Sequence, residues 1–299
     1  MDGILNINKP CGMTSHDVVD YIRKITNIKK VGHTGTLDPD ATGVLPVCIG
    51  RATKIVQFLI NENKSYRITL LLGVSTDTQD ITGKIIKEVR DFNITPGDIQ
   101  EILQSFSGDI LQVPPMVSAL HYKGKRLYKL AREGKEVERR PRKITVYKID
   151  LLEVKLPYVG FSIKCSKGTY VRTLCSDIGD KLGTGACLYN LVRTMAGSFD
   201  LNNAIGLKDI KDIEIVKKNL MPMDEALNHL PEIKVLPEGI KLLKCGKPLT
   251  GNSVFSYSGV FNPRGLYRLY QEENPAISGI VEDVSREGKI YRIVKWLNQ

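Results

Sequence analysis

Residues 31–50 read VGHTGTLDPDATGVLPVCIG, and the rest of the chain is organised around this stretch. It contains four glycines, two prolines, three threonines, two aspartates and one histidine. This mixture is too punctuated for the interior of a helix and too polar for a core strand, so it predicts a shaped loop. The apolar run VLPVCI, which follows Gly43, is typical of a buried strand and predicts that the loop is mounted on the core of a sheet.

Asp38 is the residue of this loop whose side chain has the most restricted presentation. Pro39 lacks a backbone donor, fixes its own φ and disfavours the α region for Asp38. A carboxylate held in one orientation suits catalysis. The alternative is an ordinary turn, because Asp before Pro is a common turn former. A calcium loop is rejected, because the last position of that pattern requires a bidentate Glu and is Ile49 here.

Helix and strand patterns alternate along the whole chain. Thr14 and Asp17 fit a capping box and predict a helix to about Ile25, after a turn at Lys9. Apolar periodicity, caps and turn residues predict further helices over residues 52–60, 95–106 and 170–182, and strands over residues 5–8, 65–72, 144–154, 158–165 and 188–192.

The composition favours a folded protein with an anionic partner. With 299 residues, of which 42% are hydrophobic, the chain can bury a substantial core in one large domain plus a small one. The net charge of +10 favours nucleic acid over a membrane, because no long apolar run or basic amphipathic anchor is present. The N-terminus shows no secretory signal, so we expect a cytoplasmic protein.

No metal site or cofactor is predicted. The six cysteines form no CxxC pair and are expected to be reduced thiols, and the four histidines form no cluster. Neither GxGxxG nor GxxxxGKS occurs, so the chemistry is expected to depend on side chains alone.

The segment from His121 to Lys143 holds ten lysines or arginines against three glutamates, a net charge of +7. Charge runs are usually solvated faces, but this segment also contains Tyr122 and Tyr128 and fits a surface that follows phosphates.

Arg172 lies near the start of a predicted helix, where the helix dipole disfavours a cation. Its position therefore suggests a pairing with a carboxylate.

The run GHTGTLDPDATGVLP resembles the signature loop of the TruB family of tRNA pseudouridine-55 synthases, with Asp38 at the position of the catalytic aspartate. Further motifs resemble the family in the same order: GILNINKPCGMTSHDVV, KSYRITLLLGVSTDTQDITG, QVPPMVSALHYKGKRLYKLAREG and KGTYVRTLCSDIGDKLGTGACLYNLVRT. The resemblance extends from Gly3 to about Gly197. It implies an α+β pseudouridine-synthase fold with a mixed, largely antiparallel central sheet flanked by helices.

The resemblance also implies a domain organisation. A catalytic domain would cover residues 1–230, with an RNA-binding insertion around residues 121–143. A small β-rich, PUA-like RNA-binding domain would cover residues 231–299, in agreement with the prolines near residues 221–237 and the glycine-punctuated short strands beyond them.

The implied reaction is the isomerisation of uridine 55 in the T-loop of the tRNA T-arm to pseudouridine, by base flipping and an aspartate-dependent rearrangement of the glycosidic bond. The implied enzyme is a monomer that needs no cofactor. Two alternatives stay open: a guide-RNA-dependent pseudouridine synthase of the same superfamily, and a non-catalytic RNA-binding protein.

The resemblance assigns catalytic roles to two residues besides Asp38. Arg172 is implied to pair with Asp38 and keep it ionised. Tyr66 is implied to stack on the uracil and to be placed for the proton on C5.

Six further residues are implied to bind substrate. His33 would fill the space left by extruded bases, and Tyr170 and Leu191 would wall the pocket. Asp80 matches another active-site position of the family. Lys54 and Arg193 would face RNA phosphates, although Val192 stands where some relatives carry a second arginine before the one matched by Arg193.

Overall fold

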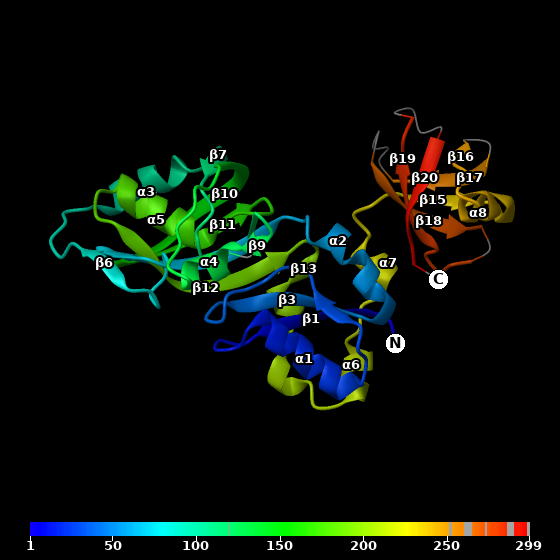
Figure 1. The fold of residues 1–299 in the computed structure, drawn as a ribbon, viewed down its shortest axis with the longest axis horizontal. Coiled ribbons are helices and arrows are strands. Elements are labelled where there is room, and N and C mark those ends of the chain that lie inside the picture. The colour runs from blue at the N-terminus through cyan, green and yellow to red at the C-terminus, as the bar shows by residue number, and fades with distance from the viewer. Residues whose placement is uncertain (119, 251–252, 260–264, 273, 286–289, 298–299) are drawn as a thin grey trace.

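The computed structural model describes residues 1–118, 120–250, 253–259, 265–272, 274–285 and 290–297. Two large sheets organise these residues, and Figure 1 shows them well separated in the longest dimension of the molecule. The first contains ten strands: β1 (Gly3–Lys9), β2 (Val31–His33), β3 (Thr42–Ile49), β4 (Lys64–Leu72), β7 (Gly108–Gln112), β10 (Arg142–Lys155), β11 (Tyr158–Cys165), β12 (Ala186–Ala196), β13 (Phe199–Asp200) and β14 (Ile205–Gly206).

The first sheet is mixed and largely antiparallel, as predicted. Its strand order is β14-β1-β3-β12-β4-β11-β10-β7, with β2 paired to β3 and β13 paired to β12. The parallel pairs within this sheet are β1 with β14 and β12 with β3. The pairing of β12 with β3 joins the two halves of the sheet at the loop that carries Asp38.

The main helices pack on this sheet at its two ends, α1 (Ser15–Thr26) and α6 (Ile213–Lys218) beside β1, and α3 (Pro96–Gln104) and α5 (Val171–Lys181) beside β10 to β12 (Figure 1). The predicted capping box at Thr14 and the predicted helix start at Thr95 are confirmed, and the second is also a capping box. Thr14 and Asp17 exchange hydrogen bonds at the start of α1, and Thr95 and Asp98 do so at the start of α3. One continuous hydrophobic cluster buries the inner faces of these helices against the strands.

Several element predictions need adjustment. The stretch 31–50 is a loop only over residues 34–41, because residues 31–33 pair with β3. β3 is buried along almost its whole length, which confirms the predicted mounting on the core. Residues 50–59 form a 3-10 turn, Gly50–Ile55, followed by the short helix α2 (Val56–Leu59). β12 is longer than the predicted strand over 188–192.

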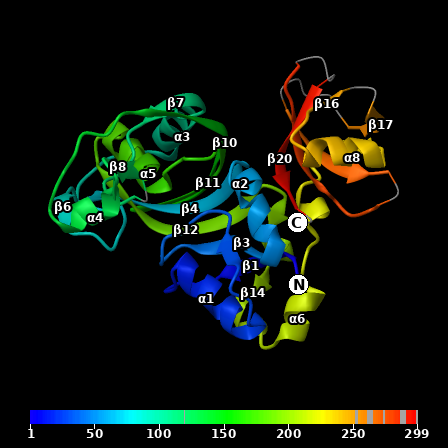
Figure 2. The same cartoon turned by 45° about the vertical axis from the view of Figure 1, so that its right-hand side comes forward.

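The second sheet comes from the C-terminal part of the chain, and α8 (Pro237–Lys244) packs against it, as Figure 2 shows. A short helix, α7 (Met223–Ala226), precedes this sheet in the chain. The strand order of the second sheet is β16-β20-β19-β18-β15-β17. These strands are β15 (Glu232–Val235), β16 (Leu249–Thr250), β17 (Val254–Ser258), β18 (Leu266–Gln271), β19 (Gly279–Asp283) and β20 (Ile290–Trp296).

One hydrophobic cluster belongs to both sheets. The part of the chain around the first sheet contributes residues of β1, β3 and α2, including Phe58 and Leu59. The part around the second sheet contributes Tyr270, Ile280 and Leu297. The sheets are therefore joined by buried apolar surface as well as by the chain.

Two small hairpins project from the first sheet (Figure 1). One pairs β5 (Val74–Thr76) with β6 (Ile85–Glu88), and the other pairs β8 (His121–Tyr122) with β9 (Lys125–Arg126). The second hairpin continues into the short helix α4 (Leu127–Arg132), within the basic segment 121–143. Among the residues whose positions are described, no helix is long and apolar enough to cross a membrane.

Candidate active site

The backbone on either side of Asp38 is fixed by hydrogen bonds to the N-terminal segment. The Ser15 hydroxyl donates to the carbonyl oxygen of Leu37 at 3.1 Å and accepts from its N–H at 2.8 Å. On the other side, the carbonyl oxygen of Pro39 accepts from the N–H of Gly12 at 3.0 Å. Asp38 thus lies between two residues that are each pinned by the N-terminal segment.

Lys9 provides a further anchor, whereas the sequence suggested only a turn residue. It ends β1 with no exposed surface, and its Nζ donates to the carbonyl oxygens of Pro10, Met13 and Pro39 at 2.9, 2.6 and 2.9 Å. Burial lowers the pKa of this ammonium, and the charge of Asp38 opposes that effect. A buried cation therefore lies beneath the loop that carries the carboxylate.

Arg193 is a second buried cation at this loop, and its predicted contact with phosphate is not supported. Only 2% of the residue is exposed. Its Nε donates to the carbonyl oxygen of Val44 at 2.7 Å and its Nη2 to that of Gly35 at 3.1 Å. Gly35 lies near the start of the loop and Val44 lies in β3 just after its end, so Arg193 holds the loop at both ends.

Gly43 allows β3 to approach Arg193 this closely. It has a φ of +101° and lies opposite Arg193 in the parallel pairing of β3 with β12. A Cβ at this position would collide with the backbone of Arg193. A glycine is therefore required here by both the backbone conformation and the lack of space.

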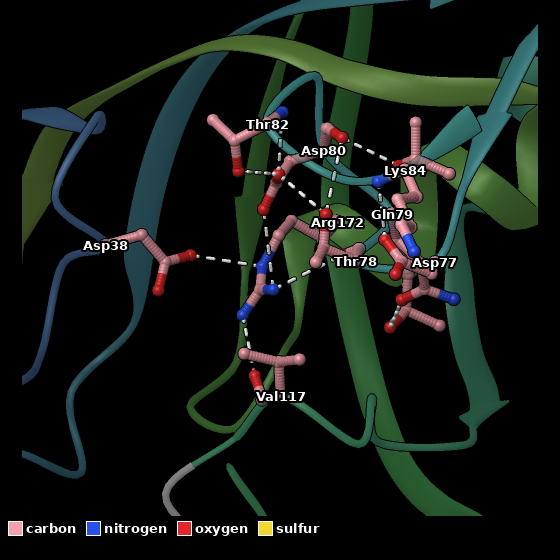
Figure 3. A network of polar contacts seen from close by, with 11 residues as sticks. Asp38, Asp77, Thr78, Gln79, Asp80, Thr82, Lys84, Val117 and Arg172 are labelled. Atoms are coloured by element: carbon pink, nitrogen blue, oxygen red, sulfur yellow. Dashed lines mark hydrogen bonds and ion pairs between the residues drawn. The ribbon is translucent and has the colours of Figure 1, made fainter. Parts of the chain in front are cut away.

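Asp38 and Arg172 form an ion pair, as Figure 3 shows. The Nε of Arg172 lies 3.1 Å from Oδ2 of Asp38, and the arginine side chain is 8% exposed whereas the carboxylate is 47% exposed. The structure thus brings the two residues together, with Asp38 presented to solvent and Arg172 behind it. The dipole of α5 disfavours a cation at its second residue, and the facing carboxylates offset this cost.

Three further contacts fix the Arg172 guanidinium (Figure 3). Its Nη1 donates to the carbonyl oxygen of Thr78 at 3.1 Å and lies 3.5 Å from Oδ2 of Asp80. Its Nη2 donates to the carbonyl oxygen of Val117 at 2.8 Å. The planar fork of an arginine suits this multiple contact.

Asp80 is itself held in place by the turn that carries it. Its Oδ1 accepts from the hydroxyl of Thr78 at 2.8 Å, and from the hydroxyl and N–H of Thr82 at 2.6 and 3.1 Å. One oxygen is therefore occupied by the turn while the other faces Arg172.

The two predicted tyrosines lie around the ion pair. Tyr66 on β4 is half-buried, and burial raises the pKa of its phenol while the nearby Arg193 lowers it. Tyr170 is the residue just before α5, and burial likewise raises the pKa of its phenol. The charge of Asp38 acts on both phenols, which is consistent with their closeness to the carboxylate.

Gln112 orients Tyr170 and was not predicted as a site residue. Its amide side chain is buried, donates to the carbonyl oxygen of Tyr170 at 3.1 Å and accepts from its N–H at 2.8 Å. This double contact imitates a strand pairing and fixes the backbone at the start of α5.

A pocket with an empty volume of about 350 Å³ lies between the Asp38 loop and the Asp80 turn. The predicted residues Asp38, Asp80 and Leu191 line it, together with Tyr189, which the sequence did not suggest.

The other predicted site residues lie outside the lining of this pocket, namely His33, Lys54, Tyr66, Tyr170, Arg172 and Arg193. His33 ends β2, and its Nδ1 accepts from the N–H of Gly35 at 3.2 Å; burial lowers the pKa of its imidazole, so the ring is neutral at pH 7. Lys54 points to the second sheet, where its Nζ donates to the carbonyl oxygens of Trp296 and Leu297 at 3.2 and 3.5 Å. The structure therefore places Lys54 at the junction of the sheets.

Within the described ranges, no three histidine, cysteine, aspartate or glutamate side chains gather in a group that could hold a metal ion. The residues that the sequence did not reveal are mainly those that hold others in place, namely Lys9, Ser15 and Gln112. Lys9 and Ser15 do belong to the N-terminal motif KPCGMTS, and this motif was the available signal.

Two family models match the chain in succession. Residues 23–171 match the TruB family pseudouridylate synthase (N-terminal domain), and residues 172–228 match the tRNA pseudouridylate synthase B C-terminal domain. The second match ends before the first strand of the C-terminal sheet, at Glu232.

Curated relatives cover nearly the whole chain. A tRNA pseudouridine synthase B of Clostridium tetani is 48% identical over 273 residues, which are 91% of this chain and 93% of that protein. A tRNA pseudouridine synthase B of Alkaliphilus oremlandii is 45% identical over 301 residues, 99% of each chain.

Solved structures with the same fold are found among ribonucleoprotein components. A chain in a Cbf5-Nop10-Gar1 complex is 28% identical with a TM-score of 0.77, and the match covers 99% of this chain and 84% of that chain. A chain in an H/ACA RNP bound to a substrate RNA containing 2′-deoxyuridine is 26% identical with a TM-score of 0.75, at 99% and 85% coverage.

Proposed function

The chain belongs to the TruB family of pseudouridylate synthases, and on this premise we propose that it converts uridine 55 in the T-loop of tRNA to pseudouridine. The enzyme is a tRNA pseudouridine synthase, as its curated relatives are named. The position of the target uridine is the finer part of the proposal. The observation that carries the assignment is the Asp38–Arg172 ion pair beside a pocket of about 350 Å³.

The reaction requires three things of the protein. The bond between C1′ and N1 of the uridine must break, the freed base must turn, and C1′ must join C5, which then loses its proton. An oriented carboxylate can begin this sequence, and the ion pair with Arg172 orients Asp38.

Tyr66 is placed to serve the later steps. Its phenol is affected by the charge of Asp38, and Tyr66 lies opposite Arg193 in the pairing of β4 with β12. We assign it the stacking contact with uracil and the acceptance of the C5 proton. Tyr170 and Leu191 would enclose the base, and Asp80 would act through Arg172.

RNA binding is assigned to surfaces outside the pocket. The target base must leave the stack, and contacts with the RNA backbone and with aromatic side chains offset the cost of a few kcal/mol. Most basic side chains of segment 121–143 are exposed in the structure, and we assign this segment to the phosphates of the T-arm. Residues 1–230 would then be the catalytic domain, and the sheet in residues 231–299 a PUA-like RNA-binding domain.

A guide-RNA-dependent activity is the second candidate, because the solved structures that resemble this chain belong to ribonucleoprotein complexes. The higher identity with relatives named tRNA pseudouridine synthase B favours the first candidate, which we propose to act in the cytoplasm as a monomer.

The test uses the purified full-length protein with a T-arm stem-loop labelled with tritium at C5 of the uridines. We expect release of one tritium per RNA, and mapping of the product to position 55, with no further protein or RNA added. A stem-loop with cytidine at position 55 is the matched control and should release none. Activity that appears only after addition of partner proteins and a guide RNA would instead support the second candidate.

A further inference from the structure

We propose that Arg193 is a positioning residue that holds the phenol of Tyr66 and the loop of Asp38 in one fixed arrangement for proton transfer. This inference rests on the proposed function, because it concerns the same site. It replaces the contact with RNA phosphate that the sequence suggested for this arginine.

The burial of Arg193 excludes a direct role in binding RNA. Only 2% of the residue is exposed, and in the described part of the chain its side chain forms no ion pair with a carboxylate. A buried and unpaired charge is costly, so it persists only where other polar groups compensate it. Here the compensating groups are three oxygens, on Gly35, Val44 and Tyr66.

The three oxygens come from separate parts of the site. The carbonyl oxygens of Gly35 and Val44 flank the loop that carries Asp38. Tyr66 lies directly opposite Arg193 in the antiparallel pairing of β4 with β12. A single guanidinium therefore fixes the position of the loop relative to the strand that carries the tyrosine, and no other contact in the site spans both in this way among the residues described.

The contact also determines the direction of the phenol proton. A guanidinium carries only donors, so the phenol oxygen of Tyr66 is the acceptor in its contact with Arg193. The proton of the phenol is then left to point away from Arg193. The same cation stabilises the phenolate when that proton leaves.

The charged and titratable groups that act on Tyr66 come from three neighbouring elements. Arg193 on β12 favours the phenolate, whereas Asp38 in the loop and Cys165 on β11 disfavour it. Burial raises the pKa of the Cys165 thiol to about 11, so this group stays neutral at pH 7. Arg193 is thus the cation that opposes the effects of burial and of Asp38 on the phenol.

The proton balance of the step is simple. When C5 has joined C1′, the electrons of its C–H bond return to the ring and the proton passes to the oxygen of Tyr66. N1, which lost its bond to the sugar, takes up one proton, so the base neither gains nor loses a proton overall. Tyr66 accepts a proton only as the phenolate, and Arg193 raises the fraction of that form.

The test compares the wild type with Arg193→Gln and with Arg193→Lys, and uses Tyr66→Phe to identify the tyrosine signal. Protein labelled with 13C at the ζ carbon of tyrosine reports the titration of Tyr66 by NMR. We expect R193Q to raise the phenol pKa and to shift the rising limb of the single-turnover pH profile upward by a similar amount. At pH 7.5 the rate should fall about 10- to 100-fold, with Kd for tRNA within about twofold.

The lysine variant keeps the charge but cannot reach all three oxygens, so both the phenol pKa and the rate should lie between those of the wild type and R193Q. If R193Q does not fold, the lysine variant alone is compared with the wild type in phenol pKa and rate. An unchanged titration of Tyr66 in both variants would overturn the proposal. So would weaker tRNA binding with a smaller salt slope and a normal rate at saturating RNA, which is the behaviour of a phosphate contact.

Failure of the proposed function would look different. The wild type would then leave uridine unchanged, whereas the titration of Tyr66 would still differ between the wild type and R193Q.

Discussion

The loop around Asp38 and the basic segment 121–143 are both assigned to RNA, yet they are held in opposite ways. Buried groups fix the loop at Leu37 and Pro39 and at its two stems. The basic segment buries mainly Leu127 and Leu130, and most of its charged side chains are exposed. Chemistry needs a fixed geometry, whereas attraction of a phosphate backbone needs charge and tolerates movement.

The largest expected effect is that of Asp38→Asn, which removes the carboxylate and leaves the shape of the loop intact. Isomerisation should fall at least about 1,000-fold, while Kd for the T-arm stem-loop stays within about threefold. Tritium release under single-turnover conditions and a binding titration measure the two quantities. Asp20→Asn, which removes an exposed carboxylate from α1, is the control and should be fully active. Undiminished activity of D38N would remove the assigned role.

The second-largest effect is expected for Arg172→Lys, which tests whether geometry or charge matters at the ion pair. Arg172→Lys keeps the charge but cannot contact Asp38, Asp80 and the Val117 carbonyl at the same time. We expect a loss of about 100-fold in rate. The same exchange at Arg126, in the basic segment, should change neither rate nor Kd by more than about twofold, because only charge is needed there. Equal effects at the two positions would contradict the distinction between the regions.

A smaller effect is expected when charge is removed from the basic segment. The triple variant Arg126→Gln, Lys129→Gln and Arg132→Gln removes three exposed cations. Kd should rise about tenfold near 0.15 M salt, and the slope of log K against log salt should become shallower by about 2 to 3. The rate at saturating RNA should not change. A large loss of rate at saturation would show that the segment also orders the active site.

The smallest effect is that of Ser15→Ala, which removes both hydrogen bonds to the Leu37 backbone. Leaving these buried groups unsatisfied should lower the free energy of unfolding by about 1–2 kcal/mol. Urea unfolding measures this change, and the rate should fall only a few-fold because other anchors of the loop remain. Ser105→Ala, at an exposed position after α3, is the control. No change in stability would contradict the assigned role of Ser15.

The sequence predicted features that depend on neighbouring residues. The capping box at Thr14 and the cap at Thr95, followed by Pro96, predicted helix starts that the structure contains. The unfavourable position of Arg172 at a helix start suggested a carboxylate partner, and the structure places Asp38 there. In both cases the residues that allowed the prediction lie within a few positions of a helix start.

What the sequence could not predict depends on pairing between distant strands. The burial of Lys9 follows from the pairing of β1 with β3, and that of Arg193 from the place of β12 between β3 and β4. Both residues look like ordinary surface cations in the sequence. The position of Lys54 likewise depends on the second sheet, more than 240 residues away.

The hydrophobic cluster that both sheets share has a consequence for how the protein loses its structure. If the second sheet detached on its own, it would uncover Phe58 and Leu59 on one side and Ile280 and Leu297 on the other. Because such a partly opened form exposes large apolar surface, it is unfavourable in water and prone to aggregate. We therefore expect the two sheets to unfold in one cooperative transition, and a chain cut between them to leave an exposed apolar face on each fragment.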